Sequence, residues 1–218
     1  MVNGKQLDIA DGPAALLPSG NVLVMTSPGV YGKGAVFFEW DGFTFTEVPG
    51  TPNAPTDSSY YGNMLVLPTG QILLTDASLD VELYSPTGSP DPSWAPTITS
   101  VATQLKHGKS YSVQGTQFNG LSQGAAYGDD SQAASNYPLV RITNTATGHV
   151  FYCLTVKPSS MGVATGSLIV SANFTVPAKI ELGASQLEAV TNGIASAPVS
   201  VTINYLFFTD CAPGSLNL

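Results

Sequence analysis

The sequence predicts an all-β protein, and three observations support this class. Short apolar or alternating runs recur along the whole chain, separated by turn residues that include 22 glycines and 16 prolines. No segment of ten or more residues has the convincing periodicity of an amphipathic helix. Residues 14–26 and 64–75 repeat one another at an offset of 50 residues, which indicates a repeated β unit.

Each copy of the repeat consists of two apolar strands joined by a tight turn. The turns are Pro18-Ser-Gly20 and Pro68-Thr-Gly70, and each lies between two continuous apolar runs of the kind that buried strands show. The flanking runs are Ala14–Leu17 and Asn21–Thr26 in the first copy, and Met64–Leu67 and Gln71–Thr75 in the second.

A further apolar run with an aromatic end follows each copy, Ala35–Trp40 after the first and Val81–Tyr84 after the second. Asp41-Gly42 is a strong hairpin signal, and it leads into the alternating run Phe43–Val48. Four strands in 40 to 50 residues are typical of one blade of a β-propeller. The first half of the chain therefore predicts a partial propeller of about two blades.

The second half predicts a β-sandwich. Seven short strands over about 110 residues match the size of an immunoglobulin-like unit. Ala184–Val190 is the best local helix candidate, but its neighbours Gly183 and Asn192-Gly193 favour a strand and a hairpin. The seven expected strands are Ser110–Val113, Leu139–Ile142, His149–Leu154, Ser167–Val170, Ile180–Leu182, Gln186–Val190 and Pro198–Ile203.

The charge changes at the boundary between the two halves. Residues 1–95 hold ten acidic and two basic residues, whereas residues 96–218 hold five of each, so the first half carries the whole net charge of −8. The prolines of Pro86–Pro92 oppose both helix and strand pairing. We expect blades over residues 1–92, the sandwich over 93–203 and a tail strand over 204–218.

Composition excludes several functions and leaves others open. Seven basic residues and a net charge of −8 exclude nucleic acid as a partner. No run of about 18 apolar residues predicts a membrane span. The first twelve residues contain no signal-peptide core, so the protein is cytoplasmic or its leader is not part of this sequence. Cys153 and Cys211 form one disulfide or remain two inert buried thiols.

Two stretches resemble a known family. Tyr60-Tyr61-Gly62, three residues and then Val66–Gly70 keep the spacing of a late blade motif of the kelch propellers in the galactose oxidase and glyoxal oxidase family. Ala95–Val101 and Lys109–Phe118 resemble the start of the immunoglobulin-like early-set domain that ends this family. The resemblance covers about residues 11–203 and implies the last blades of such a propeller followed by the early-set sandwich.

The same resemblance implies a copper site made by two tyrosines and two histidines, which here is degenerate. Tyr60 matches one tyrosine, but Tyr61 replaces the adjacent histidine. The second histidine position falls on Thr147, and the nearest histidine is His149. The crosslinked tyrosine and cysteine belong to earlier blades that this sequence lacks. We therefore expect Tyr60 and Tyr61 to pack between blades, with no copper bound and no catalysis.

Hard cations are the other metal candidates. Asp129 and Asp130 lie in a glycine-containing loop with Ser131, and Ca²⁺ prefers such oxygen ligands, although a solvated turn is the default interpretation. Asp76 with Asp80 and Glu82 is a weaker candidate of the same kind. The histidines His107 and His149 are expected in exposed turns, and no Ser-His-acid motif is present.

The residues favour a non-catalytic structural or binding module of the extracellular space or cell envelope. Its uncharged polar surface, with Trp40, Trp94 and Tyr31 as aromatic platforms, suits contact with carbohydrate or with other protein chains. The alternatives are a copper-radical oxidase remnant and a self-assembling subunit. Because two blades leave open edges, we expect missing blades from a larger chain, a homo-oligomer or a docking partner, with Tyr205–Phe208 adding a strand.

Overall fold

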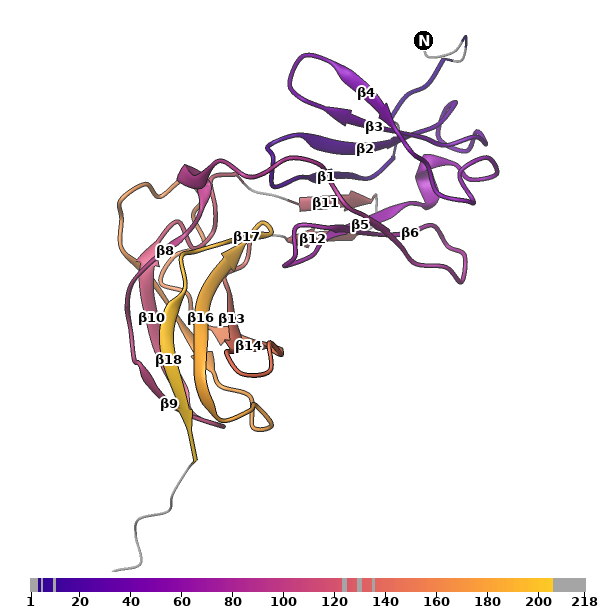
Figure 1. Ribbon diagram of the computed structural model, residues 1–218. Coiled ribbons are helices and arrows are strands. Elements are labelled where there is room, and N and C mark those ends of the chain that lie inside the picture. Colours follow the sequence, from indigo (N-terminus) through magenta and orange to yellow (C-terminus); the bar gives the residue numbers. More distant parts are fainter. Residues whose placement is uncertain are drawn as a thin grey trace, which may run out of the picture.

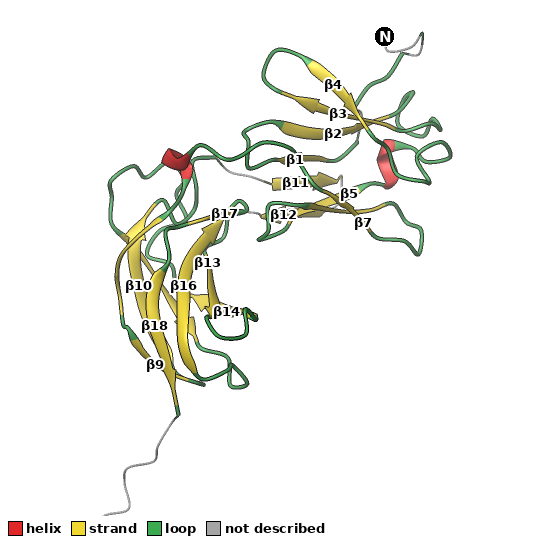
Figure 2. Ribbon diagram, viewed as in Figure 1, coloured by secondary structure: helices red, strands yellow, loops and turns green. Residues whose placement is uncertain are grey.

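The computed structural model describes residues 4, 6–9, 11–122, 125–128, 131–134 and 136–205, and it confirms the all-β class (Figures 1 and 2). Within this part of the chain the only helical elements are two single 3₁₀ turns, η1 (Ser59–Tyr61) and η2 (Pro92–Trp94). No described helix has the length and hydrophobicity needed to cross a membrane. The architecture is a partial propeller followed by a β-sandwich.

The propeller part consists of two antiparallel sheets in which strands follow their chain order. The first sheet has four strands and the second has three. The strands are β1 (Ala14–Leu16), β2 (Val22–Thr26), β3 (Val36–Trp40) and β4 (Phe45–Val48), then β5 (Asn63–Val66), β6 (Ile72–Thr75) and β7 (Glu82–Tyr84).

The two repeated turns have the same backbone geometry. Leu17 N–H donates to the Asn21 carbonyl and Gly20 N–H to the Leu17 carbonyl, at 2.8 and 2.9 Å, and Leu67 and Gly70 make the equivalent bonds at the same distances. Gly20 and Gly70 have φ values of +90° and +85°, a region that glycine reaches without a Cβ penalty. The two repeated segments therefore share their backbone structure as well as their sequence pattern.

The second sheet lacks a fourth strand because of its sequence. Trp40 pairs with Phe45 across the β3–β4 hairpin, and Tyr84 has the place in β7 that Trp40 has in β3. The segment equivalent to β4 is therefore 89–92, which reads Ser-Pro-Asp-Pro. Proline has no N–H to donate to a strand ladder, so the chain leaves the sheet there. The expectation of four strands per unit holds only for the first unit.

The two sheets face each other through an apolar core. Leu23, Met25 and Phe37 from the first sheet are almost completely buried, as are Ile72 and Leu74 from the second. These side chains alternate along their strands, as period-two geometry requires. The inner strands β1 and β5 make the closest approach between the two sheets.

The sandwich is formed by one sheet that curls around a second core. Its order is β8-β10-β15-β14-β13-β16-β18-β9, with β17 paired to β16 and β9 parallel to β18. The strands are β8 (Thr97–Val101), β9 (Gln104–Lys106), β10 (Ser110–Thr116), β13 (Leu139–Asn144), β14 (Val150–Val156), β15 (Val170–Thr175), β16 (Gly183–Thr191), β17 (Ile194–Ala195) and β18 (Val199–Asn204).

Two of the seven expected sandwich strands are misplaced. The strand expected over Ser167–Val170 begins only at Val170, because the inward residues of β15 are Val170, Ala172 and Phe174. No strand forms over Ile180–Leu182. Ile180 closes a turn on Pro177 at 3.2 Å and fills the core from a loop, so its hydrophobicity reports burial and not strand pairing.

A hairpin from the second half of the sequence lies in the propeller part. Its strands are β11 (Ala125–Gly128) and β12 (Ser131–Ala134), and β11 lies against both β1 and β5 (Figure 1). Asp129 and Asp130, the calcium candidates, fall outside the described residues, as do Cys211 and the tail beyond Tyr205. The hairpin thus lies between the two blade-like sheets.

A second connection is made by the turn Asn192-Gly193 between β16 and β17. It is a two-residue turn with φ values of +49° and +75°, the pattern of a type I′ hairpin. A Cβ atom on Gly193 would lie 2.5 Å from the Gly70 Cα atom, and one on Gly70 would lie 2.8 Å from the Pro18 ring. The second repeated turn therefore contacts this turn of the sandwich, and the first repeated turn contacts the second through Pro18.

Candidate functional site

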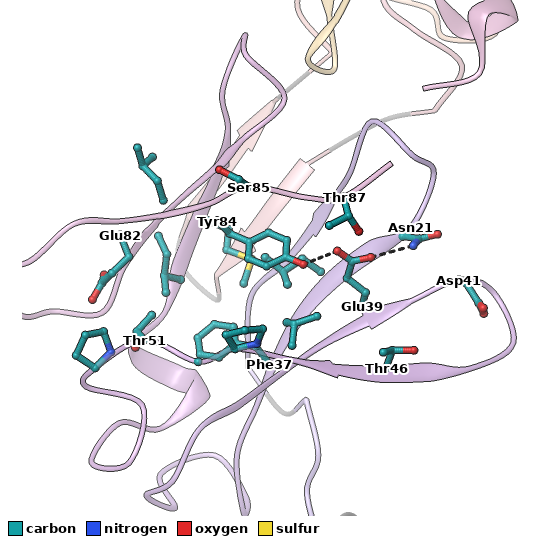
Figure 3. A pocket seen from close by; sticks show the side chains of 18 residues that line it. Asn21, Phe37, Glu39, Asp41, Thr46, Thr51, Glu82, Tyr84, Ser85 and Thr87 are labelled. Carbon is teal, nitrogen blue, oxygen red and sulfur yellow. Dashed lines mark hydrogen bonds between the residues drawn. The ribbon is translucent and has the colours of Figure 1, made fainter. Parts of the chain in front are cut away.

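A cleft of about 710 Å³ opens between the two blade-like sheets at their outer strands (Figure 3). One wall comes from β2, β3 and β4, and the other comes from β7 together with Met64 of β5 and Leu74 of β6. The consecutive residues Glu82, Leu83, Tyr84 and Ser85 all line it. Because neighbouring strand residues point to opposite faces, a cleft lined by all four runs along the edge of β7. This is the position that a fourth strand of the second sheet would occupy.

Hydrogen bonds join the two walls of the cleft at one place. The Tyr84 hydroxyl of β7 donates to Glu39 Oε1 of β3, and Asn21 Nδ2 donates to Glu39 Oε2 at 2.9 Å (Figure 3). Burial, reinforced by the Glu39 carboxylate, raises the pKa of Tyr84 well above its usual range. Tyr84 therefore stays protonated and remains a donor, which fixes the separation of the two sheets.

Other oxygen atoms of the cleft are buried and accept no hydrogen bond from the described part of the protein. They are both carboxylate oxygens of Glu82 and the hydroxyl oxygen of Thr51. Burial raises the pKa of Glu82, and the nearby carboxylates of Asp76 and Asp80 raise it further. The lining includes Glu39, Asp41 and Glu82 but no basic residue. The cleft therefore offers acceptors and negative charge to a ligand that carries donors or positive charge.

A pair of carboxyl groups lies near the cleft. Burial raises the pKa of Asp57 to about 6, and the adjacent Asp76 carboxylate contributes to the shift. The pKa of Asp76 is lowered, despite the opposing effect of burial, by hydrogen bonds from Ser78 and Asn53. The protonated carboxyl group of Asp57 thus donates a hydrogen bond to the carboxylate of Asp76. Sequence spacing gave no signal for this pair, because 18 residues of loop and strand separate the two positions.

Asp76, Asp80 and Glu82 do not form the cation site that was expected from the sequence. Asp76 is buried and bonded to Ser78 and Asn53, and Glu82 faces the cleft. Across the ranges that the structure describes, no three His, Cys, Asp or Glu side chains are grouped so as to hold a metal ion.

The residues around Tyr60 do not fit the copper centre that the resemblance implies. Tyr60 lies in η1, and its ring centroid is 4.9 Å from that of Tyr31 and 5.5 Å from that of Tyr61. His149 lies in the sandwich, where its Nδ1 atom is 2.6 Å from Glu181 Oε1. Both of these ring neighbours are phenols, and neither is an imidazole ligand of the kind that Cu²⁺ prefers.

A row of exposed leucines crosses the outer face of the second sheet. Leu65, Leu73 and Leu83 are directly opposite one another on β5, β6 and β7. Leu65 and Leu83 are 38% and 56% exposed, and Leu73 is half-buried. This row could not be predicted from the sequence, because the continuous apolar run Ile72–Leu74 does not indicate which face of the strand is covered.

The exposed aromatic residues lie in three separate places. Trp40 stacks on Phe45 at 6.2 Å on the first sheet, Tyr31 belongs to the cluster with Tyr60, and Trp94 lies between the propeller part and the sandwich. The three platforms expected from the sequence do not form one surface.

Comparison with known proteins gives no family. No family model matches the chain, and no curated protein has a similar sequence. Among solved structures, the crystal structure of S-layer protein SbsC domains 4 and 5 aligns with 94% of this chain and 95% of that chain, at 10% identity and a TM-score of 0.20. A TM-score this low does not place the two chains in a common fold.

Proposed function

We propose that the protein is a non-catalytic structural and binding module of the extracellular space or cell envelope, which joins another polypeptide by accepting an extended strand along β7. The observation that carries this proposal is the cleft, which runs along the free edge of a three-stranded sheet whose partner sheet has four strands. Addition of a strand to an open edge is a general mode of peptide recognition. We include in this proposal the resemblance of about residues 11–203 to the last blades and the early-set domain of the galactose oxidase and glyoxal oxidase family.

The chemistry of the cleft specifies the incoming strand. Its apolar side chains would face Phe37, Leu74 and the other inner residues, and a basic side chain would give Glu82 the donors that it lacks. A lining with three acidic residues and no basic one favours such a partner by charge complementarity. The exposed leucine row beside the edge supports the same role, since in-register apolar residues are typical of a covered face.

The best available probe is the strand that already fills the equivalent position in the first sheet. A peptide with the sequence of residues 41–50 contains β4 and is expected to bind the cleft in a saturable way, as measured by fluorescence anisotropy. The same peptide with Glu47→Lys should bind more tightly, because the lining is acidic. The control peptide with Thr46→Pro should bind less, because proline removes a ladder donor.

Failure of both strand-forming peptides to bind would overturn the proposal, as would equal binding of the proline control. Sedimentation of the full chain over a wide concentration range separates two sources of the strand. A mass that rises with concentration supports donation by a second copy, and a constant monomer mass together with peptide binding supports a different chain.

Carbohydrate contact is the second candidate function. The observation that favours it is a separate pocket beside Trp94, which has uncharged walls and buried acceptor oxygens. Oxidation of alcohols or aldehydes by a copper radical is not part of the proposal, because the neighbours of Tyr60 do not fit that centre.

A further inference from the structure

A second cavity lies between the propeller part and the sandwich, at the turn Asn192-Gly193. We call it the junction pocket; it has a volume of about 330 Å³, within the range of small-ligand sites. Its walls come from four separate parts of the chain, so it exists only in the folded protein. Its lining includes Leu16, Trp94, Leu121, Thr191, Asn192 and Ile194.

Trp94 forms a fixed wall of the junction pocket. It ends η2, which Asp91 caps by accepting a hydrogen bond from Ser93 N–H at 2.8 Å. The indole lies so close to the turn of the first repeat that a Cβ atom on Gly20 would be 2.7 Å from the ring. A planar aromatic side chain held in this way provides a flat apolar surface for a ligand.

Two oxygen atoms at the junction pocket are buried without a donor. Thr191 and Asn192 are 2% and 7% exposed, and Thr191 Oγ1 and Asn192 Oδ1 accept no hydrogen bond from the described residues. Asn192 Nδ2 donates to the Ser122 carbonyl at 3.5 Å, which leaves the amide oxygen as the end without a partner. Buried acceptors are normally satisfied, so this pair points to a molecule that brings donors.

The remaining walls restrict the charge and polarity of that molecule. No ionisable side chain lines the junction pocket, and Leu16, Leu121 and Ile194 are apolar. The molecule is therefore neutral, has one apolar face and carries hydroxyl or N–H donors at its edge. A sugar ring has this combination, because its C–H groups form one face and its hydroxyl groups project from the rim.

We propose that the junction pocket binds one ring of a neutral carbohydrate. The C–H face lies on Trp94, and hydroxyl groups donate to Thr191 Oγ1 and Asn192 Oδ1. This proposal rests on the second candidate function, carbohydrate contact, and it is independent of the strand-accepting function, since the cleft along β7 and the junction pocket share no lining residue.

The chain contains two tryptophans, so the variant Trp40→Phe leaves Trp94 as the only indole. Fluorescence of this variant should change in a saturable way on titration with at least one of four probes: the methyl glycosides of glucose, galactose, mannose and N-acetylglucosamine. Absence of a saturable change with all four would overturn the proposal.

Two substitutions in the Trp40→Phe background test the acceptor oxygens. Thr191→Val keeps the shape of the side chain and should weaken binding about tenfold, while the melting temperature stays equal or rises because an unsatisfied hydroxyl is removed. Asn192→Gly keeps the left-handed turn and should weaken binding similarly. Thr202→Val on β18 is the matched control and should bind like the parent. Unchanged affinity in both pocket variants would overturn the proposal.

Discussion

Gly193 and Gly70 are in direct backbone contact, and this contact joins the sandwich to the propeller part. A Cβ atom on Gly193 would lie 2.5 Å from the Gly70 Cα atom and 2.9 Å from its nitrogen. Gly193 also has a φ of +75°. The position therefore requires glycine for two reasons, conformation and space.

The substitution Gly193→Ala should destabilise the protein by more than the ~1 kcal/mol that a left-handed alanine costs. Thermal unfolding measures the effect. Gly148→Ala is the control, because Gly148 has a φ of +73° with open space around it. Equal losses in the two variants would show that conformation alone accounts for the effect and that the contact contributes nothing.

The hydrogen bond from Tyr84 to Glu39 predicts a second stability effect. Tyr84→Phe removes a donor from a buried carboxylate and leaves Asn21 as its remaining partner. We expect a loss of about 1–3 kcal/mol in the free energy of unfolding, measured with urea. Tyr31→Phe, at an exposed ring, should change it little. A Tyr84→Phe variant as stable as the parent would contradict a bond between the sheets.

Asp57 predicts a fall in stability as the pH rises. Its folded-state pKa of about 6 lies above its ordinary value, so its protonated form is favoured by folding. The corresponding stability is fully present below pH 4 and is lost as the pH rises through 6. In Asp57→Asn the amide can still donate to Asp76, and melting temperatures between pH 4 and 7 should fall less. A parallel fall in both proteins would refute this assignment.

Cys153 is expected to be chemically inert in the folded protein. Its side chain is buried in the sandwich core, and burial raises the pKa of its thiol to about 12. Since the thiolate is the reactive species, iodoacetamide should not modify Cys153 in a Cys211→Ser variant until denaturant is added. Rapid modification without denaturant would show that the core opens readily or that the thiol is exposed.

The sequence was informative where structure is local. The turns at Gly20 and Gly70 were predictable because proline and glycine fix the backbone of a tight hairpin without help from the rest of the fold. The same holds for Asn192-Gly193, whose residue types specify a type I′ turn. The resulting all-β class follows from these turns and from the short apolar runs between them.

Tertiary relationships were not predictable. Nothing in the sequence of Asn192-Gly193 indicates that this turn packs on Gly70, and the pairing of Asp57 with Asp76 depends on how two loops meet. Residues 125–134 have small side chains without clear alternation, so the hairpin β11–β12 gave no strand signal. Ile180 shows the opposite error, in which a hydrophobic residue fills the core from a loop.

The position of β11 between β1 and β5 bears on how the chain is made. A ribosome releases the strands of both blade-like sheets before it has translated residues 125–134, which complete their inner side. We expect the early sheets to remain unfinished until that hairpin emerges. A chain cut at residue 92 would separate β1 and β5 from the hairpin that packs on them, and we expect neither fragment to reach the native fold alone.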